Sequence, residues 1–297
     1  MRMDDERESR NVDDRRASSG RSGGGMPSMG TMMMLWPIVK PLLRSKFGML
    51  IVGVGAAAYF MGYNPLALVG MGGGASAPVD KVKDEKQAVF IKKVLASTED
   101  IWKQNLRGYK EPIMVLYRGS TRSGCGHASA QMGPFYCPAD QKVYLDLGFF
   151  DELASRHNAP GDFAQAYVLA HEVGHHIQNL QGTLAQVQKA KQSWGGSSKK
   201  ANALQVKVEL QADCYAGAWA YHAHKQFDIL EPGDIEEALR AASSIGDDTL
   251  QRQAGGAVRP DAFTHGSSKQ RIEWFRRGVK TGDIRQCNLL GLLTNSP

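Results

Sequence analysis

The sequence predicts an α+β fold: a mainly helical domain with a small β-sheet, preceded by a disordered tail and one transmembrane helix. Three observations support this prediction. The first 30 residues are mostly polar and rich in glycine and serine, residues 47–79 carry no charged side chain, and the rest shows first mixed and then helical periodicity. The chain has 297 residues, 42% of them hydrophobic and 22% charged, so it can bury a core.

The N-terminal segment, residues 1–45, is expected to be a disordered tail. Its polar part carries too few apolar side chains to offset the entropy lost when the chain is ordered. Within it, the charged block of residues 11–16 is a candidate for a local contact.

The uncharged segment that follows predicts a transmembrane helix over residues 46–72. Its apolar, Gly/Ala-rich run begins at Phe47 and, with residues 66–69, reaches the roughly 20 residues that a bilayer requires. One alternative is a buried core helix, which is usually shorter and has a polar face. Another is a cleaved signal peptide, which normally has a shorter charged region before its apolar run.

The charges on either side of this segment predict its orientation. Lys40, Arg44 and Lys46 precede it with no acid between them, whereas acids and bases balance just after it, from Asp80 onward. Because cytoplasmic flanks carry the excess of positive charge, we expect a cytoplasmic N-terminus and a domain on the opposite side of the membrane.

All four cysteines lie beyond the apolar segment. Cys125 and Cys137 lie in a Gly/Pro-containing stretch that can fold back on itself, which favours a disulfide between them and leaves Cys214 to pair with Cys287. Such disulfides persist in an oxidising compartment. The alternative is four buried or free thiols.

Residues 80–297 are expected to form one domain. Apolar side chains at helical spacing predict a helix over residues 86–106, and short β-branched and aromatic runs predict strands at 112–117 and 142–147. Residues 143–147 could offer an edge on which an extended peptide pairs. From Asp162 onward the pattern is helical almost to the end.

One predicted helix, of about 19 residues, carries the candidate chemistry, with Asp162 able to cap its start and Gly182 able to end it. His171 and His175 are four residues apart, so both imidazoles project from one face and can bind one metal ion. Glu172, rotated by roughly 100° about the helix, lies beside that ion within reach of a water molecule. This H-E-x-x-H pattern is typical of metalloproteases in which the glutamate is the general base.

A catalytic zinc ion usually has three protein ligands. No histidine follows at the H-x-x-G-x-x-H spacing, which excludes the metzincin subclass. On a helix predicted over residues 199–226, Glu209 and Asp213 interrupt a face of small apolar residues, where a carboxylate is costly unless it is paired or binds metal. We expect Glu209 to be the third ligand and Asp213 to orient one histidine. The alternative is a solvated face or a salt bridge to Lys200 or Lys207.

Peptide hydrolysis also needs a group that stabilises the developing oxyanion. His265 is a candidate because it lies in a Gly/Ser turn before a helix predicted over residues 270–280, where a side chain can face a cleft. Tyr215 competes with it for this role.

Two other polar residues near these motifs are expected to have structural roles. His176 follows His175 directly and points away from the metal face, so we expect a partly exposed structural histidine. Arg271 is expected to pair with an acid, such as Glu273 or Asp261, rather than to bind a substrate carboxylate.

The chain resembles the bacterial putative neutral zinc metallopeptidases of the YpfJ type. The resemblance spans nearly the whole length and includes residues 11–16, 125–146, 171–178, 209–214 and 265–275. It implies a single-pass protein of the bacterial inner membrane with a periplasmic, zincin-like domain. This domain would bind one Zn²⁺ through His171, His175 and Glu209, with Glu172 as the base. His265 falls within one of the matching blocks, which strengthens its candidacy.

The sequence therefore predicts a membrane-anchored zinc-dependent peptidase whose partner is a polypeptide substrate. The alternative is a membrane-tethered zinc-binding interaction module of the cell envelope, which Glu172 disfavours because a scaffold needs ligands but no base. Zinc is the default metal for two nitrogens and one oxygen, although Mn²⁺ and Fe²⁺ also suit such ligands. The net charge of +6 does not predict a nucleic-acid partner, because the basic residues are interleaved with acids.

Overall fold

Residues 1–17, 40 and 80–290 are described by the structure, which is a computed structural model. The chain divides into a unit made of Met1–Ser19 and Lys81–Pro297 and a second unit, Gly20–Asp80. The first unit contains every helix and strand considered below. Its mainly helical character and small sheet confirm that part of the predicted fold class.

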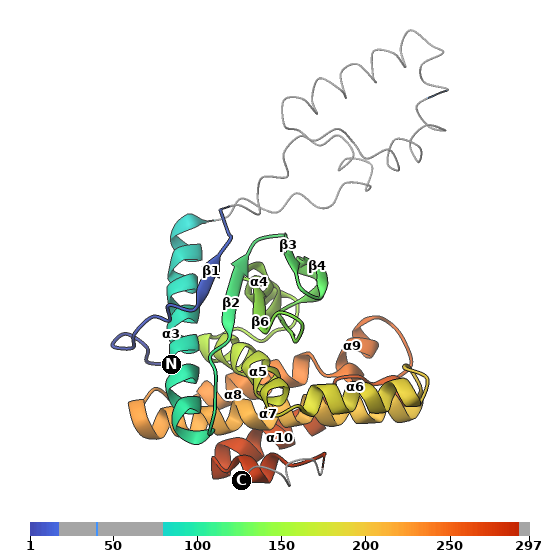
Figure 1. Cartoon of the computed structure of the whole chain (residues 1–297). Helices are drawn as coiled ribbons and strands as arrows, with labels where there is room; N and C mark the ends of the chain where they lie inside the picture. Colours follow the sequence, from blue (N-terminus) through green and yellow to red (C-terminus); the bar gives the residue numbers. More distant parts are fainter. Residues whose placement is uncertain (18–39, 41–79, 291–297) are drawn as a thin grey trace. The chain divides into compact units, whose positions relative to one another are not determined.

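A four-stranded mixed sheet lies above the main helices in Figure 1. Its strand order is β1 (Val12–Asp14), β2 (Ile113–Tyr117), β6 (Lys142–Asp146) and β5 (Phe135–Cys137). The first three strands are parallel, whereas β5 runs antiparallel to β6. β2 and β6 are buried along most of their length, as expected of strands rich in β-branched and aromatic residues. A separate hairpin, β3 (Ser120–Ser123) and β4 (Gly126–Ser129), connects β2 to β5.

The helices gather around α5 (Asp162–Leu180), which carries the H-E-x-x-H sequence. This helix packs against α3 (Lys81–Asn105), α7 (Lys199–Phe227) and α8 (Asp234–Ser244), and also touches β5 and β6. The other α-helices of the described residues are α4 (Gly148–Ser155), α6 (Thr183–Ser193), α9 (Asp247–Gln253) and α10 (Ser268–Thr281). Because α5 contacts both the helical layer and the sheet, it is buried on almost all sides.

Two glycines allow α10 to approach α7 very closely. A Cβ atom on Gly217 would collide with the carbonyl of Phe275, and one on Gly278 would collide with the carbonyl of Cys214. Only residues without a side chain can occupy such a crossing. The crossing fixes α10, and with it Arg271, against the middle of α7.

Both predicted disulfides are present. Cys125, in the turn between β3 and β4, is bonded to Cys137 at the end of β5, and Cys214 on α7 is bonded to Cys287. The first ties the hairpin to the edge of the sheet. The second ties the short 3₁₀ helix η4 (Ile284–Cys287) to α7. The predicted pairing is confirmed, and the alternative of free thiols is excluded.

The prediction of a disordered tail is wrong for residues 1–17. Val12 lies opposite Met114, so β1 extends the sheet as a parallel neighbour of β2. A strand that completes an existing sheet needs little apolar surface of its own, which is why composition did not reveal it. The remainder of the predicted tail, apart from Lys40, lies outside the described residues.

A buried carboxylate on α3 holds the N-terminal segment in place. Glu99 is only 1% exposed and accepts hydrogen bonds from Ser9 Oγ at 2.5 Å, Asn11 Nδ2 at 2.9 Å and Arg7 at 2.8 Å. All three donors come from the N-terminal segment, so this segment is part of the folded unit.

The predicted single-pass topology is therefore wrong. Residues 1–17 and 81–290 pack into the same unit, whereas one membrane crossing between them would place them on opposite sides. None of the helices in the described ranges is long and apolar enough to cross a membrane. This corrects the predicted inner-membrane location with a cytoplasmic N-terminus and an extracytoplasmic domain. The predicted span, residues 46–72, lies outside the described residues.

Two local predictions also differ from the structure. Residues 143–147 offer no free edge, because β6 lies between β2 and β5; the edge strand on that side of the sheet is β5. The helix α5 has the predicted 19 residues, but its N-cap is Gly161. The Asp162 carboxylate instead accepts a hydrogen bond from the amino group of Met1 at 3.1 Å.

We expect deletion of residues 1–17 to lower the free energy of unfolding by about 3–5 kcal/mol, because Glu99 then loses all three donors. Urea unfolding followed by circular dichroism measures this loss. As a control, Arg2→Ala removes only an exposed ion pair with Asp228 and should cost less than about 1 kcal/mol. An unchanged unfolding midpoint for the deletion would show that the segment is not part of the stable fold.

Candidate metal centre

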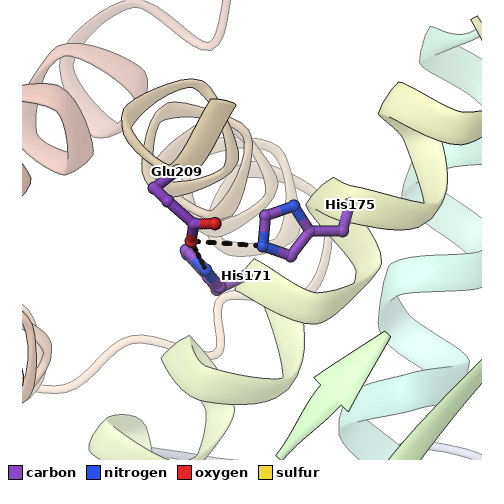
Figure 2. A group of neighbouring side chains, drawn as sticks. All are labelled: His171, His175 and Glu209. Carbon is purple, nitrogen blue, oxygen red and sulfur yellow. Dashed lines mark ion pairs between the residues drawn. The ribbon is translucent and has the colours of Figure 1, made fainter. Parts of the chain in front are cut away.

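Two histidines of α5 and one glutamate of α7 point toward a common position (Figure 2). His171 Nε2 lies 3.3 Å and His175 Nε2 lies 3.4 Å from Glu209 Oε2. The two imidazoles stand one helical turn apart, with ring centroids separated by 4.8 Å. The structure thus brings together the three residues that the sequence predicts as ligands.

The separations of these atoms fit a tetrahedral zinc ion. Ligand atoms that each lie about 2.0–2.1 Å from a tetrahedral zinc are about 3.3–3.4 Å from one another. Two imidazole nitrogens and one carboxylate oxygen also form a donor set that catalytic zinc uses, with a fourth position open to water. Among the described residues, one other group, Asp162, Asp234 and Glu237, could hold a metal, but it offers only carboxylates.

Gly174, inside the H-E-x-x-H sequence, sets the distance between the two helices. A Cβ atom at this position would lie 3.0 Å from the Cα atom of Ala212 on α7. Contact this close would require α7 to shift by a few tenths of an ångström. The absence of a side chain at Gly174 therefore lets Glu209, about one turn before Ala212, reach the histidines.

Each candidate ligand is also held by a hydrogen bond at its other polar atom. The pairs are His171 Nδ1 with Asp213 Oδ1 at 2.9 Å, His175 Nδ1 with Gln178 Oε1 at 2.8 Å, and Glu209 Oε1 with Gln205 Nε2 at 2.9 Å. Because carboxylate and amide oxygens only accept, each Nδ1 carries a proton, which leaves Nε2 as the ring atom that can bind a metal. The arrangement matches the role that the sequence predicts for Asp213.

Asp213 is the centre of a buried network. It accepts hydrogen bonds from the Tyr167 hydroxyl at 2.5 Å and from Arg271 at 2.9 Å through two nitrogens, in addition to His171. Burial works to raise the pKa of Asp213, but Arg271 and His171 outweigh this effect and lower the pKa to about 2. Arg271 thus pairs with Asp213, not with the predicted acids near it in sequence, because the α7–α10 crossing places it there.

The carboxylates also shift the pKa values of the metal-free histidines. Burial works to lower the pKa of His171, but Asp213 and Glu209 outweigh it and raise this pKa to about 9. The pKa of His175 is raised against burial by Glu209, and that of Glu209 is lowered against burial by the two histidines. The metal-free His171 therefore carries a second ring proton, on Nε2, at neutral pH, and a metal ion must displace it.

The candidate site lines a cavity of about 480 Å³. His171, Glu172, His175 and Glu209 contribute to its wall, which is otherwise largely apolar. Glu172 is only 7% exposed, lines this cavity and helps to raise the pKa of His175 through its negative charge. Its carboxylate therefore lies beside the candidate ligands, at a cavity that a water molecule or a substrate can enter.

His265, one of the two oxyanion candidates, lies at this cavity. Its side chain is 52% exposed, and Nδ1 lies 3.2 Å from Asp247 Oδ1. The other oxygen of Asp247 accepts hydrogen bonds from the backbone N–H groups of residues 264–266 at 2.6–3.0 Å. Asp247 therefore fixes both the imidazole and the loop that carries it.

Tyr215, the other oxyanion candidate, does not line the cavity. It is fully buried, and its hydroxyl donates a hydrogen bond to Gln181 at 3.1 Å. Its ring packs edge-on against Trp102. The structure does not support an oxyanion role for Tyr215, because this position faces a different side of α7 from Glu209.

His176 is buried, at 1% exposed, and not partly exposed as predicted. Its Nε2 lies 2.6 Å from the carbonyl oxygen of Lys110, and its Nδ1 lies 3.1 Å from the hydroxyl of Tyr136. Burial lowers the pKa of this imidazole. The prediction that it points away from the metal ligands agrees with these contacts.

Four residues that hold the site together are not predicted from the sequence: Tyr167, Gln178, Gln205 and Asp247. Three of them lie three or four positions from a ligand on the same helix, so helical spacing could have identified them. Asp247 lies 18 residues from His265 in the sequence and contacts it only in the folded protein, so no local sequence pattern predicts their pairing.

An H-E-x-x-H helix, a glutamate from a second helix and an adjoining cavity together have the features of a zincin-like metallopeptidase site. A family model described as "Putative neutral zinc metallopeptidase" matches residues 1–290, and the chain belongs to this family. The predicted resemblance is thereby confirmed.

Relatives in two groups of bacteria support this assignment. The chain is 45% identical over 303 residues to "Uncharacterized protein YpfJ" of Escherichia coli (strain K12), covering 98% of this chain and 99% of that protein. It is 46% identical over 202 residues to "Uncharacterized protein Rv2575" of Mycobacterium tuberculosis, covering 65% of this chain and 67% of that protein. No solved structure matches the chain.

We expect zinc binding at neutral pH to release about one proton from His171, because its pKa of about 9 keeps it protonated in the metal-free protein. Zinc affinity should therefore rise with pH until this pKa is passed. Calorimetric titration in buffers of different ionisation enthalpy measures the protons released. Heats that do not depend on the buffer at neutral pH would contradict a protonated His171 in the metal-free protein.

Proposed function

We propose that the protein is a zinc-dependent peptidase that hydrolyses peptide bonds with Glu172 as the general base. The main supporting observation is the convergence of His171, His175 and Glu209 at separations suited to zinc, with the Glu172 carboxylate at the same cavity. The family supports a metallopeptidase, and the geometry supports the residues that carry out each role.

The three ligands would hold zinc where it polarises a scissile carbonyl and lowers the pKa of a water molecule. Glu172 takes the proton of the attacking water and delivers it to the leaving nitrogen. His265, paired through Nδ1 with Asp247, has its other ring nitrogen free to donate to the developing oxyanion when the imidazole is protonated.

The edge strand β5 is the candidate for binding an extended polypeptide. It ends the sheet beside β6, and its residues Phe135 and Tyr136 line the cavity together with Gly133 and Pro134. An extended peptide can pair with such an edge through its backbone, while alternate side chains enter pockets. The largely apolar wall then favours apolar side chains in the substrate.

We expect Glu172→Gln to lower the rate of cleavage of an unfolded protein by about 10²–10⁴-fold, because the amide cannot accept the proton of water. Zinc content should stay at that of the unaltered protein, because Glu172 is not a ligand. The exposed Glu152 provides a control: Glu152→Gln should leave both quantities unchanged.

Two outcomes would contradict the proposal in different ways. Full cleavage by Glu172→Gln would show that Glu172 is not the base. If the zinc-loaded, unaltered protein binds polypeptides but never cleaves them, the protein is a zinc-binding interaction module and not a peptidase.

A further inference from the structure

The edge strand β5 has few contacts of its own that could fix its position. It is only three residues long and pairs on one side, with Phe135 opposite Tyr144 and Cys137 opposite Lys142. The disulfide from Cys137 ties its end to the hairpin β3–β4, which lies on the same side of the molecule as the sheet. These contacts fix β5 relative to the sheet but not relative to α5.

The side chain of Tyr136 supplies the missing connection. Its hydroxyl accepts a hydrogen bond from Asn179 Nδ2 at 2.9 Å and lies 3.1 Å from His176 Nδ1. His176 Nε2 lies 2.6 Å from the carbonyl oxygen of Lys110, just before β2. The rings of Tyr136 and His176 also meet edge to face, with centroids 5.4 Å apart.

The donor and the acceptor of each hydrogen bond in this small network around Tyr136 can be assigned. A carbonyl only accepts, so Nε2 of His176 is the donor to Lys110. In the neutral ring Nδ1 is then an acceptor, and the Tyr136 hydroxyl donates a hydrogen bond to it. Asn179 donates to the remaining lone pair of the same oxygen. All of these groups are satisfied, and both Tyr136 and His176 are buried.

His176 and Asn179 belong to the same helix as the candidate metal ligands. They follow His175 by one and four positions, so a rigid segment of α5 carries both the ligands and the partners of Tyr136. Any displacement of β5 from α5 would break a hydrogen bond between Tyr136 and α5, at a cost of roughly 1–3 kcal/mol for each buried group left unsatisfied.

We propose that His176 and Asn179 are positioning residues that act through Tyr136. They hold the edge strand β5 at a fixed distance from the metal centre and thereby set which bond of a paired, extended peptide reaches Glu172. This inference rests on the proposed function, in which β5 binds the substrate. It assigns a role to the histidine that directly follows the H-E-x-x-H sequence.

The test compares two tyrosines of the same sheet. Tyr136→Phe removes only the hydroxyl that α5 holds. Tyr144→Phe is the matched control, because the Tyr144 hydroxyl donates to Asp140 at 2.6 Å on the sheet side and does not contact α5. Asn179→Ala is a second variant, which leaves the tyrosine ring in place.

The first readout is the kinetics of the zinc-loaded, full-length protein with a long peptide that spans β5 and with a minimal peptide. For Tyr136→Phe and Asn179→Ala we expect kcat/KM for the long peptide to fall about tenfold, mainly through KM, because the paired backbone is no longer held in register. The minimal peptide and the Tyr144→Phe control should show unchanged constants. Equal losses for both peptides, or no loss for either, would overturn the proposal.

The second readout does not need turnover. Amide hydrogen exchange over residues 134–138 should be faster in Tyr136→Phe than in Tyr144→Phe, while exchange around His171 and the zinc content stay as in the unaltered protein. If exchange in β5 is the same in both variants, α5 does not hold the strand and the proposal fails. A protein that cleaves no peptide but shows this exchange difference would refute the proposed function and not the coupling of β5 to α5.

Discussion

The close approach of α5 to α7 at Gly174 is the constraint on which the candidate site depends. Ligands from one helix cannot surround a metal ion, so His171 and His175 need a third donor from another element. Glu209 supplies it because Ala212 packs directly against Gly174, with no side chain between the two backbones. With this contact in place, Glu209 Oε2 lies 3.3 and 3.4 Å from the two imidazoles.

The buried ion pair of Asp213 and Arg271 also helps to keep the candidate ligands in place. A buried pair of this kind contributes little net stability, because the cost of removing both charges from water offsets their attraction. Its role here is to orient the imidazole of His171. Arg271 fixes both oxygens of Asp213, Asp213 fixes His171, and the glycine crossing of α7 and α10 fixes Arg271. Three helices thereby determine the direction of one imidazole.

Most of the correct predictions about the site came from the helical spacing of residues close together in the sequence. The spacing of His171, Glu172 and His175 on one helix, and of Glu209 and Asp213 on another, determines which side chains share a face, so the candidate ligands could be proposed without a fold. The pairing of the four cysteines was also predicted correctly. The sequence could not show that Arg271 pairs with Asp213 or that β5, and not β6, is the edge strand, since both depend on packing between distant segments.

The N-terminal segment, residues 1–17, shows that composition alone does not predict whether a segment folds. Its composition is that of a disordered chain, yet β1 pairs with β2 through backbone hydrogen bonds, and three polar side chains satisfy Glu99. Backbone pairing leaves no compositional signal in so short a strand. The predicted membrane topology failed for this reason, because it assumed that the residues before the apolar segment do not fold with those after it.

We propose above that Glu209 completes a zinc site with His171 and His175. The most direct test of this proposal is the zinc content of the purified full-length protein and of Glu209→Ala, measured by elemental analysis after dialysis against a weak chelator. The account predicts one zinc per chain in the unaltered protein and its loss in Glu209→Ala. Stoichiometric zinc of unchanged affinity in Glu209→Ala would contradict it.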